Sequence, residues 1–274
     1  MIGWWTSLRH MGAVLVTAPV LLVSADASLA MDANLPTADI LFIGEQHDNP
    51  HHHAAQARYV TEIKPAALVF EMISPAHAAS VEPAHRLDPD KLEALLEWET
   101  SGWPDFDMYF PIFAAAPEAQ IYGASVSREQ LRAVVMGEAA DGIVGELVAR
   151  FGLNMPLAPE QQAAREALQR ESHCNALPEN MLPGMVDAQR VRDAALAQAA
   201  LNALDQTGGP VVVITGNGHA RTDWGAPFLV TLAEPEVSVH AIGQGEAGAP
   251  PPGVFSSVED QPSVVRDDPC AAFR

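Results

Sequence analysis

The sequence predicts an α/β protein: a mainly parallel sheet flanked by helices, with a small inserted all-helical subdomain. Short apolar runs that end at glycine or a polar residue are typical of strands buried on both faces of a sheet. Segments with apolar residues at helical spacing lie between several of these runs, and one long stretch contains no strand. The expected strands are 39–43, 66–70, 120–122, 211–215 and 237–242.

The first strand leads directly into a helix. The apolar run Ile40–Ile43 ends at Gly44, and Asn49 precedes Pro50 a few residues later. Asparagine is a favoured N-cap and proline a favoured first helical residue, so a helix is expected at 50–64. The loop between strand and helix then lies at the carboxyl end of a strand, where open α/β sheets usually bind ligands.

The middle of the chain is mostly helical in pattern. Residues 76–100 favour helix, and residues 101–111 are expected to form a loop that contains Trp103 and Tyr109. Further helices are expected at 127–136, 139–151, 159–172 and 180–205. So long a stretch without a strand exceeds a simple crossover, which indicates an inserted subdomain. The expected division is a sheet domain at 31–126 and 206–243, the helical subdomain with its return helix at 127–205, and an extended tail at 244–274.

Residues 1–30 are typical of a secretory signal peptide. Arg9 precedes the apolar run Met11–Val23, and small residues follow, among them Ala27 and Ala30. The run is short for a bilayer span, which needs about 20 residues, although an uncleaved anchor is the alternative. A cleaved signal predicts a periplasmic or secreted protein.

Export would determine the redox state of Cys174 and Cys270, the chain's only cysteines. An oxidising compartment favours a disulfide between them, which would tie the tail to the body of the protein. The alternative is two unrelated free thiols. The pair alone cannot form a zinc site.

The composition restricts the partners. The chain carries 15 Lys and Arg against 35 Asp and Glu, a formal net charge of −20. So acidic a protein repels phosphate backbones, so nucleic acid is not expected as a partner. An anionic ligand would need a local basic pocket.

Two Gly-x-x-His turns follow strands far apart in the sequence, Gly44 to His47 and Gly216 to His219. In a parallel sheet both turns open at the same edge, so the two histidines are expected to share one pocket. Carboxylates accompany them, since Glu45 lies in the first turn and Glu71 follows the second strand.

This set of side chains suits more than one chemistry. His47, His219 and Glu71 could bind a divalent metal, or with Glu45 supply a general base and its orienting partner. Arg221 could hold a carboxylate or an oxyanion. A metal-dependent or histidine-base hydrolase is therefore one candidate function.

Two further side chains leave a choice between packing and ligand binding. Tyr109 is either a packing residue or a phenolate ligand for ferric iron. His173, at the end of a helix, is either a favourable cation near the helix dipole or a ligand. No Cys-x-x-Cys-His motif is present, so covalent haem attachment is not expected.

The motifs together resemble the ChaN-like haem-binding uptake proteins of the Tiki/TraB/erythromycin-esterase-like superfamily. The resemblance extends over about 39–242 and is carried by Gly44-Glu45-Gln46-His47-Asp48-Asn49 with His53 and Gln56, Phe70-Glu71-Met72, Gly102-Trp103-Pro104, Tyr109-x-Pro111, His173-Cys174, Ala188-Gln189, Arg192-Asp193 and Gly216-Asn217-Gly218-His219-Ala220-Arg221.

The resemblance implies an exported protein that binds haem non-covalently and takes part in iron uptake. It implies Tyr109 as the ligand of the haem iron, His173 as its supporting residue, and Trp103 in the cofactor site. It also implies a homodimer and uptake components of the inner or outer membrane as partners. Characterised relatives often carry a lipid-bearing cysteine that this chain lacks. The hydrolase built on Glu45, His47, Glu71 and His219 is the alternative, and a module that binds another ligand is the third.

Overall fold

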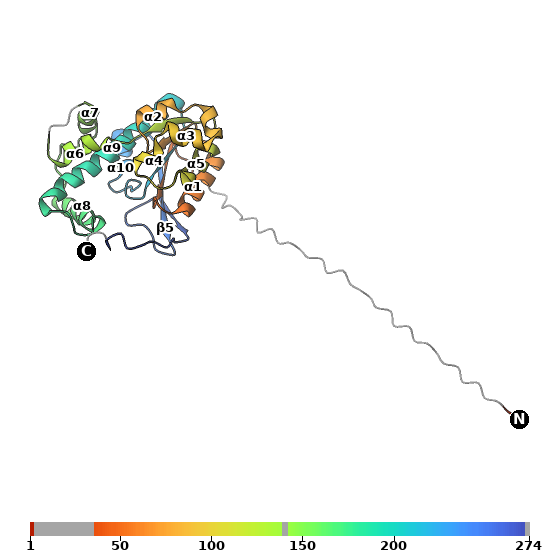
Figure 1. Ribbon diagram of the computed structural model, residues 1–274. Coiled ribbons are helices and arrows are strands. Elements are labelled where there is room, and N and C mark those ends of the chain that lie inside the picture. The colour runs from red at the N-terminus through yellow and green to blue at the C-terminus, as the bar shows by residue number, and fades with distance from the viewer. Residues whose placement is uncertain (3–35, 139–141, 272–274) are drawn as a thin grey trace. The chain divides into compact units, whose positions relative to one another are not determined.

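Six parallel strands form one sheet in the part of the chain that this computed structural model describes, residues 1–2, 36–138 and 142–271 (Figure 1). The order across the sheet is β3-β2-β4-β1-β5-β6, and every neighbouring pair is parallel. The strands are β1 (Ile40–Glu45), β2 (Ala67–Phe70), β3 (Gln120–Gly123), β4 (Val211–Gly216), β5 (Val239–Glu246) and β6 (Ser257–Gln261). The predicted α/β fold class and the predicted parallel sheet are confirmed.

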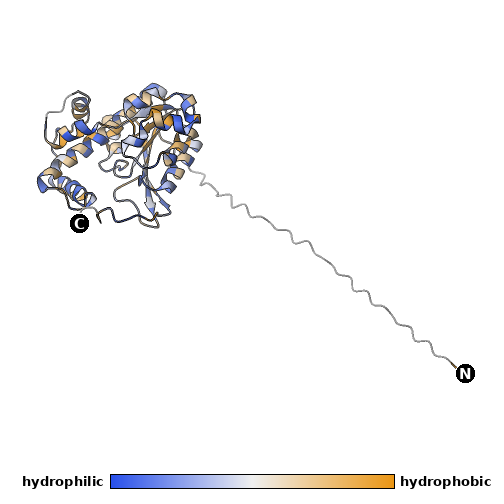
Figure 2. Ribbon diagram, viewed as in Figure 1, coloured by the Kyte–Doolittle hydropathy of each residue, from blue (hydrophilic) through white to orange (hydrophobic). Residues whose placement is uncertain are grey.

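The strands alternate their side chains between two hydrophobic layers. Ile40 and Phe42 belong to one buried cluster, whereas Leu41 and Ile43 belong to the other. A strand with apolar residues on both faces is buried on both sides, which explains why β1 reads as a continuous apolar run. Figure 2 shows hydrophobic colours on the central strands and hydrophilic stretches on the surrounding helices.

The helices cover the two faces of the sheet. The cluster that contains Leu41 and Ile43 joins the sheet to a first group of helices. The cluster that contains Ile40 and Phe42 joins it to α10 and to a second group, except the helix at 159–172. The first group is α1 (Pro50–Ile63), α2 (Pro75–Ser80), α3 (Pro89–Leu95), α4 (Trp98–Ser101) and α5 (Phe106–Ala115), with the 3-10 turn η1 (Pro83–Leu87). The second is α6 (Arg128–Val135), α7 (Gly142–Phe151), α8 (Pro159–Ser172) and α9 (Leu182–Thr207), with η2 (Glu179–Met181); α10 is Ala226–Ala233.

The start of α1 follows the predicted capping chemistry. The side chain of Asn49 accepts a hydrogen bond from the backbone N–H of His51, and Pro50 is the first helical residue. This cap fixes where the loop after β1 ends, and it therefore fixes the position of His47 within that loop.

The predicted loop at 101–111 is wrong in its second half. Residues from Phe106 form α5, which is capped by Asp105 and contains Pro111. Proline lacks the N–H of one helical hydrogen bond, so Pro111 disfavours a helix here. Packing of Phe106, Ile112 and Phe113 in the core outweighs that loss, since each is almost fully buried.

The helices of residues 127–205 are continuous with the rest of the fold. Helix α9 packs on the sheet, and buried residues of α7 and α9 share one hydrophobic cluster with β1, β2 and β4. Leu35–Arg274 accordingly form one compact unit. Helices α6, α7 and α8 pack on α9, which connects them to the sheet.

Part of the tail, expected as an extended segment at 244–274, forms regular strands. Strand β5 continues to Glu246, and β6 pairs with it in parallel at the edge of the sheet. The phenyl ring of Phe255 lies where a side chain at residue 243 would point, so Gly243 leaves room for the tail to dock. Neither the long β5 nor β6 was expected from the acidic, proline-rich sequence.

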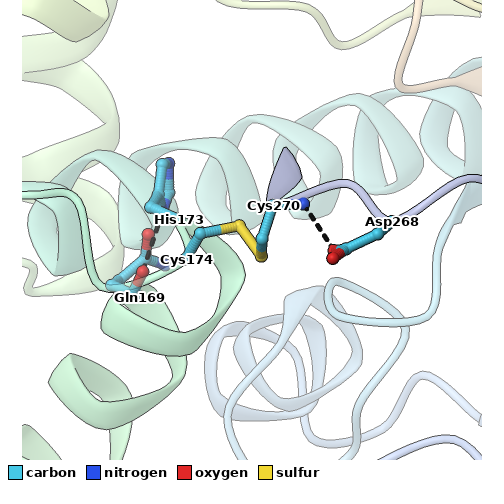
Figure 3. The surroundings of a disulfide bond; sticks show 5 residues. All are labelled: Gln169, His173, Cys174, Asp268 and Cys270. Carbon is cyan, nitrogen blue, oxygen red and sulfur yellow. Dashed lines mark hydrogen bonds between the residues drawn. A yellow bond between two sulfur atoms is a disulfide. The ribbon is translucent and has the colours of Figure 1, made fainter. Parts of the chain in front are cut away.

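A disulfide joins Cys174, just after α8, to Cys270 in the tail, with their Cα atoms 5.4 Å apart (Figure 3). The predicted disulfide is therefore present. The predicted signal peptide at 1–30 lies outside the described residues, apart from Met1 and Ile2. Among the helices that the structure describes, none is both long and apolar enough to span a bilayer.

Candidate functional site

The two Gly-x-x-His turns lie side by side, as their sequence pattern predicted. Strands β1 and β4 are direct neighbours, and Glu45 at the end of β1 is in register with Gly216 at the end of β4. A Cβ atom placed on Gly216 would lie 2.9 Å from Nε2 of His47. The glycine therefore leaves the space in which the histidine of the other turn is seated.

A cavity of about 890 Å³, called here the cleft, opens at this edge of the sheet. Its size falls within the range of small-molecule sites. His47, Glu71, His219 and Gly216 line it from the strand ends. Hydrophobic and aromatic side chains form much of the remaining wall, including Trp103, Leu131, Val135, Leu168, Met185, Val186, Trp224, Pro251 and Pro252.

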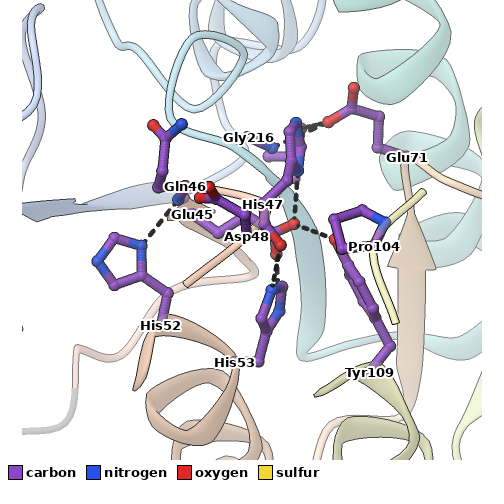
Figure 4. Close-up of polar contacts among 12 residues, drawn as sticks. Glu45, Gln46, His47, Asp48, His52, His53, Glu71, Pro104, Tyr109 and Gly216 are labelled. Atoms are coloured by element: carbon purple, nitrogen blue, oxygen red, sulfur yellow. Dashed lines mark hydrogen bonds and ion pairs between the residues drawn. The ribbon is translucent and has the colours of Figure 1, made fainter. Parts of the chain in front are cut away.

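Glu45 is the centre of a buried hydrogen-bond network beneath the cleft (Figure 4). One carboxylate oxygen accepts from the Tyr109 hydroxyl and pairs with Nδ1 of His47, both at 2.7 Å. The other accepts from Nε2 of Gln56 at 2.7 Å and lies 3.4 Å from Nδ1 of His53. Burial opposes ionisation, but the hydrogen bond from His47 and the histidine charges hold the pKa of Glu45 below its ordinary value.

Tyr109 lies in the core and not on the wall of the cleft. Its side chain is fully buried, its ring packs against Trp98 and His53, and its hydroxyl donates to Glu45. Burial and the charge of Glu45 raise the pKa of Tyr109 far above its ordinary value, so the phenol keeps its proton. This environment does not favour the phenolate ligand expected from the sequence. None of the chain's three tyrosines, all in described segments, lines the cleft.

His219 forms a second buried network with two acids. Its Nδ1 lies 2.6 Å from an oxygen of Asp193 on α9, and its Nε2 lies 3.4 Å from an oxygen of Glu71. The other oxygen of Glu71 accepts from the Thr215 hydroxyl at 2.7 Å and from the N–H of Gly216 at 2.9 Å. The turn after β4 is thereby tied to the end of β2.

The charges of this network favour an imidazolium. Burial opposes protonation of His219, but Glu71 and Asp193 raise its pKa to about 10. Burial likewise favours a neutral Glu71, yet the charge of His219 holds the pKa of Glu71 well below its ordinary value. Burial dominates at Asp193 and raises the pKa of that carboxyl group. These charges favour the protonated ring over the neutral ring that a general base requires.

His47 lies between the networks and contacts the cleft. Its ring meets the ring of Trp103 edge-on, with centroids 4.8 Å apart. Burial works against the charged ring, but the hydrogen bond with Glu45 and the charge of Glu71 raise the pKa of His47. Trp103, which the sequence assigned to the cofactor site, lines the cleft beside this ring.

The geometry does not support a divalent metal at His47, His219 and Glu71. Within residues 36–138 and 142–271, no group of three or more His, Cys, Asp or Glu side chains is arranged to hold a metal ion. The physical reason is that the nitrogen atoms of His219 and the oxygen atoms of Glu71 already have protein partners.

The guanidinium group of Arg221 is already paired with a carboxylate of the protein. The group pairs with both oxygens of Asp223, at 2.9 and 2.6 Å, and lies 3.5 Å from the centroid of the Trp224 ring. The arginine is largely buried and lines the cleft. Asp223 already occupies the bidentate face that the sequence analysis had offered to a ligand carboxylate or oxyanion.

His173 lies on the cleft wall at the end of α8, beside the disulfide (Figure 3). Its Nδ1 is 2.8 Å from the carbonyl oxygen of Gln169. A carbonyl oxygen only accepts, so Nδ1 carries the hydrogen, and in the neutral ring Nε2 carries the lone pair. No protein partner of Nε2 is found among the described residues.

The sequence analysis assigned no role to several residues of the site. Asp193 appeared there only in a motif of the family resemblance, although an acid on the inward face of a helix rich in alanine is a signal of a buried ion pair. The arginines Arg132, Arg165 and Arg192 also line the cleft, and no local pattern distinguishes them from the other arginines of their helices.

Fold and site define an α/β protein with a ligand cleft at the carboxyl edge of a parallel sheet, walled by apolar, aromatic and cationic side chains. Residues 31–230 match the family model described as haem-binding uptake, Tiki superfamily, ChaN. The match covers most of the chain, and the protein belongs to this family. No curated protein matches the sequence.

A solved structure supports the fold. A structure of ChaN from Campylobacter jejuni, which concerns cofacial haem binding, is similar with a TM-score of 0.59 and 17% identity, over 76% of this chain and 82% of that one. The type III effector HopBA1 matches with a TM-score of 0.42 and 14% identity, over 77% and 78% of the two chains. At 17% identity, the ChaN structure supports the fold alone.

Proposed function

We propose that this protein binds haem non-covalently in the cleft and takes part in haem uptake. The observation that carries the proposal is the composition of the cleft wall. It combines two tryptophans and apolar side chains with four arginines and an imidazole whose Nε2 has no partner among the described residues. Haem has the matching parts, namely a flat apolar ring, carboxylates at its edge and an iron that takes imidazole ligands.

His173 is the residue that we assign to the haem iron. The lone pair of its Nε2 is available, and the hydrogen bond from Nδ1–H to Gln169 fixes the ring, as is usual for metal-bound histidines. His47 and His219 are poorer candidates because neighbouring acids raise the pKa of each ring and so favour protonation. Bound haem would supply an iron centre with open coordination positions.

Ligation through Tyr109, the hypothesis drawn from the sequence, requires a rearrangement. The phenol would have to leave Glu45 and the aromatic cluster and reach the cleft, and it would have to lose a proton that its surroundings retain. Tyr109 acts in our proposal as a positioning residue, because it holds Glu45 and thereby His47.

A haem titration followed by absorbance tests the proposal. Wild type is expected to shift the Soret band on binding, and His173→Ala to weaken binding and alter the band. Tyr109→Phe should retain the wild-type spectrum. His240→Ala is the matched control, because this histidine lies near the start of β5, at the opposite end of the strands.

The outcomes separate the ligands. A normal spectrum in His173→Ala with a lost band in Tyr109→Phe would assign the iron to Tyr109. No spectral change in wild type would remove haem binding altogether.

Export, a homodimer and membrane uptake components complete the proposal. The disulfide supports an oxidising compartment, periplasmic or extracellular. Fractionation of cells that express the full chain tests the location, and sedimentation with and without haem tests the dimer. A cytosolic protein with reduced cysteines would contradict export.

The hydrolase alternative has weaker support. The networks of Glu45 and His219 resemble catalytic constellations, but the elevated pKa of His219, about 10, makes that ring an acid and not a base at neutral pH. The buried networks are explained more simply by their role in joining β1, β2, β4 and α9.

A further inference from the structure

Arg165 on α8 is a buried cation that has no hydrogen-bond or ion-pair partner in the described part of the chain. Its side chain lines the cleft, the residue is 8% exposed, and its Nε is buried without a hydrogen bond. Within residues 36–138 and 142–271 no oxygen accepts from the other guanidinium nitrogens, and no carboxylate lies within 4.0 Å of them. An unpaired buried charge is destabilising, so such an arrangement indicates a binding site for an anion.

The contrast with the chain's other buried arginines is informative. Arg86 also has a buried, unpaired Nε, but its other nitrogens donate to the carbonyl oxygens of Ala116, Pro117 and Ala119. Arg221 is paired with Asp223. Arg86 and Arg221 are thus satisfied by the protein, whereas Arg165 is not.

Trp224 provides the support for Arg165. The guanidinium carbon lies 5.0 Å from the centroid of the Trp224 ring, a contact that holds the charge in place without neutralising it. Burial lowers the pKa of Arg165, and the charge of Asp193 only partly opposes this effect. The group is therefore a preorganised donor that faces the cleft.

The surroundings of Arg165 add positive charge. Arg132 and Arg192 line the same cavity, are exposed, and have no hydrogen-bond or ion-pair partner in the described part of the chain. In a protein with a net charge of −20, this is the local basic surface that an anionic ligand needs.

We propose that Arg165, held by Trp224, is the recognition site for a carboxylate at the edge of a flat apolar ligand. The planar guanidinium matches a carboxylate through parallel hydrogen bonds. The inference rests on the proposed haem site and deepens it, since the recognised group would be a propionate of the tetrapyrrole. It does not depend on the iron or on His173.

Metal-free porphyrin isolates this interaction. Mesoporphyrin IX carries the carboxylates but no iron, and its dimethyl ester lacks the negative charges. Binding of both, measured by fluorescence in the same detergent, is compared for wild type, Arg165→Gln and Arg170→Gln. Arg170 is the matched control because it lies on the same helix but pairs with Glu179 outside the cleft.

The free acid is expected to bind Arg165→Gln roughly 10- to 100-fold more weakly than wild type, because the variant loses a charge-assisted hydrogen bond. Arg170→Gln should bind like wild type, and the ester should bind wild type and Arg165→Gln alike. Equal affinity of the acid for wild type and Arg165→Gln would overturn the inference. His173→Ala should leave the binding of these metal-free ligands unchanged.

Stability provides a second readout. Because Arg165→Gln removes an unpaired buried charge, the ligand-free variant should unfold at the same temperature as wild type or above it. A structural arginine would instead lower the unfolding temperature. A clear loss of stability in the absence of ligand would therefore contradict the inference.

A small-anion titration separates this inference from haem binding. The Nε–H resonance of Arg165, assigned by its absence in Arg165→Gln, should shift when phthalate is added to wild type. If neither porphyrin binds but this resonance shifts, the carboxylate site stands and haem binding fails. If porphyrin binds but the resonance moves with neither phthalate nor porphyrin, the carboxylate site fails and haem binding stands.

Discussion

Individual residues at the carboxyl edge of the sheet act mainly through charge. Glu45 and Glu71 are buried acids, and each is kept ionised by donors from other parts of the chain. Their partners come from α1, α5, β4 and the turns after β1 and β4, so each carboxylate ties several segments together. The residues of the site therefore stabilise the fold, and they also form one edge of the cleft.

His219 should make the stability of the protein depend on pH. Its pKa is raised to about 10 in the folded state, above the ordinary value of 6.5, so the folded state binds the proton more tightly. The resulting stabilisation is complete below the unfolded pKa and is lost as the pH rises towards 10. Urea unfolding of wild type should show a falling free energy of unfolding over this range.

The variant His219→Gln isolates this effect. Its free energy of unfolding should be lower than that of wild type near pH 6, and the difference should shrink as the pH increases. His85→Gln, at a surface helical turn, serves as the control and should follow the wild-type curve. A constant difference between His219→Gln and wild type across this range would show that the imidazolium is not held by its acids.

The sequence predicted the residues of the site better than their partners. His47, Glu71 and His219 follow apolar strands, and the parallel sheet necessarily brings their loops to one edge. Asp193, Arg165 and Tyr109 reach this region from helices, and their positions depend on how those helices pack. No local pattern encodes that packing, which is why Tyr109 was expected in a loop and lies in the core.

At the scale of elements, the close packing of α6 on α9 depends on Gly184. A Cβ atom at this position would clash with the backbone carbonyl group of Val135 at the end of α6. The same helix α6 places Leu131 and Arg132 on the cleft wall. Gly184 therefore links the packing of the two helices to the shape of the cleft.

Gly184→Ala should lower the free energy of unfolding by about 1–3 kcal/mol, because the two backbones must separate. The sign of this change is informative, because the same substitution in an unconstrained helix stabilises the helix by about 0.5–1 kcal/mol. Urea unfolding measures the change. Gly218→Ala is the control, because a Cβ atom there meets nothing within 4 Å. Increased stability of Gly184→Ala would show that the helices tolerate the extra methyl group.

The elements themselves were largely predictable. Five of the six strands in the described segments were expected, because short continuous apolar runs between helical segments are typical of buried parallel strands. Strand β6 was not, since Ser257–Gln261 is polar and forms an edge strand through its pairing with β5. Helix α5 was not expected, and it forms although it contains Pro111 because its apolar residues pack in the hydrophobic core.

At the scale of the whole molecule, the disulfide joins the C-terminal tail to the helical region. Cys174 and Cys270 are separated by 96 residues, which include α9, β4, α10, β5 and β6. Arg266, close to Cys270, pairs with Asp48 after β1 and with Glu246 at the end of β5. The tail therefore crosses from the strand ends to α8, next to His173.

Loss of the disulfide should destabilise the protein by about 2–4 kcal/mol, because the unfolded chain regains the freedom of a long loop. The comparison is between wild type and the double variant Cys174→Ser with Cys270→Ser in urea. Reductant should lower the stability of wild type towards that of the double variant and leave the double variant unchanged. Equal stability of the oxidised wild type and the double variant would show that the tail detaches freely.

The cysteine content has a consequence for oxidative assembly. Because the chain has only two cysteines, just one intramolecular pairing exists, and a mispaired monomer cannot form. Any incorrect product must join separate molecules. Such products would appear as covalent multimers on a non-reducing gel and would revert to monomers with thiol, without any need for an isomerase to sort alternative bridges.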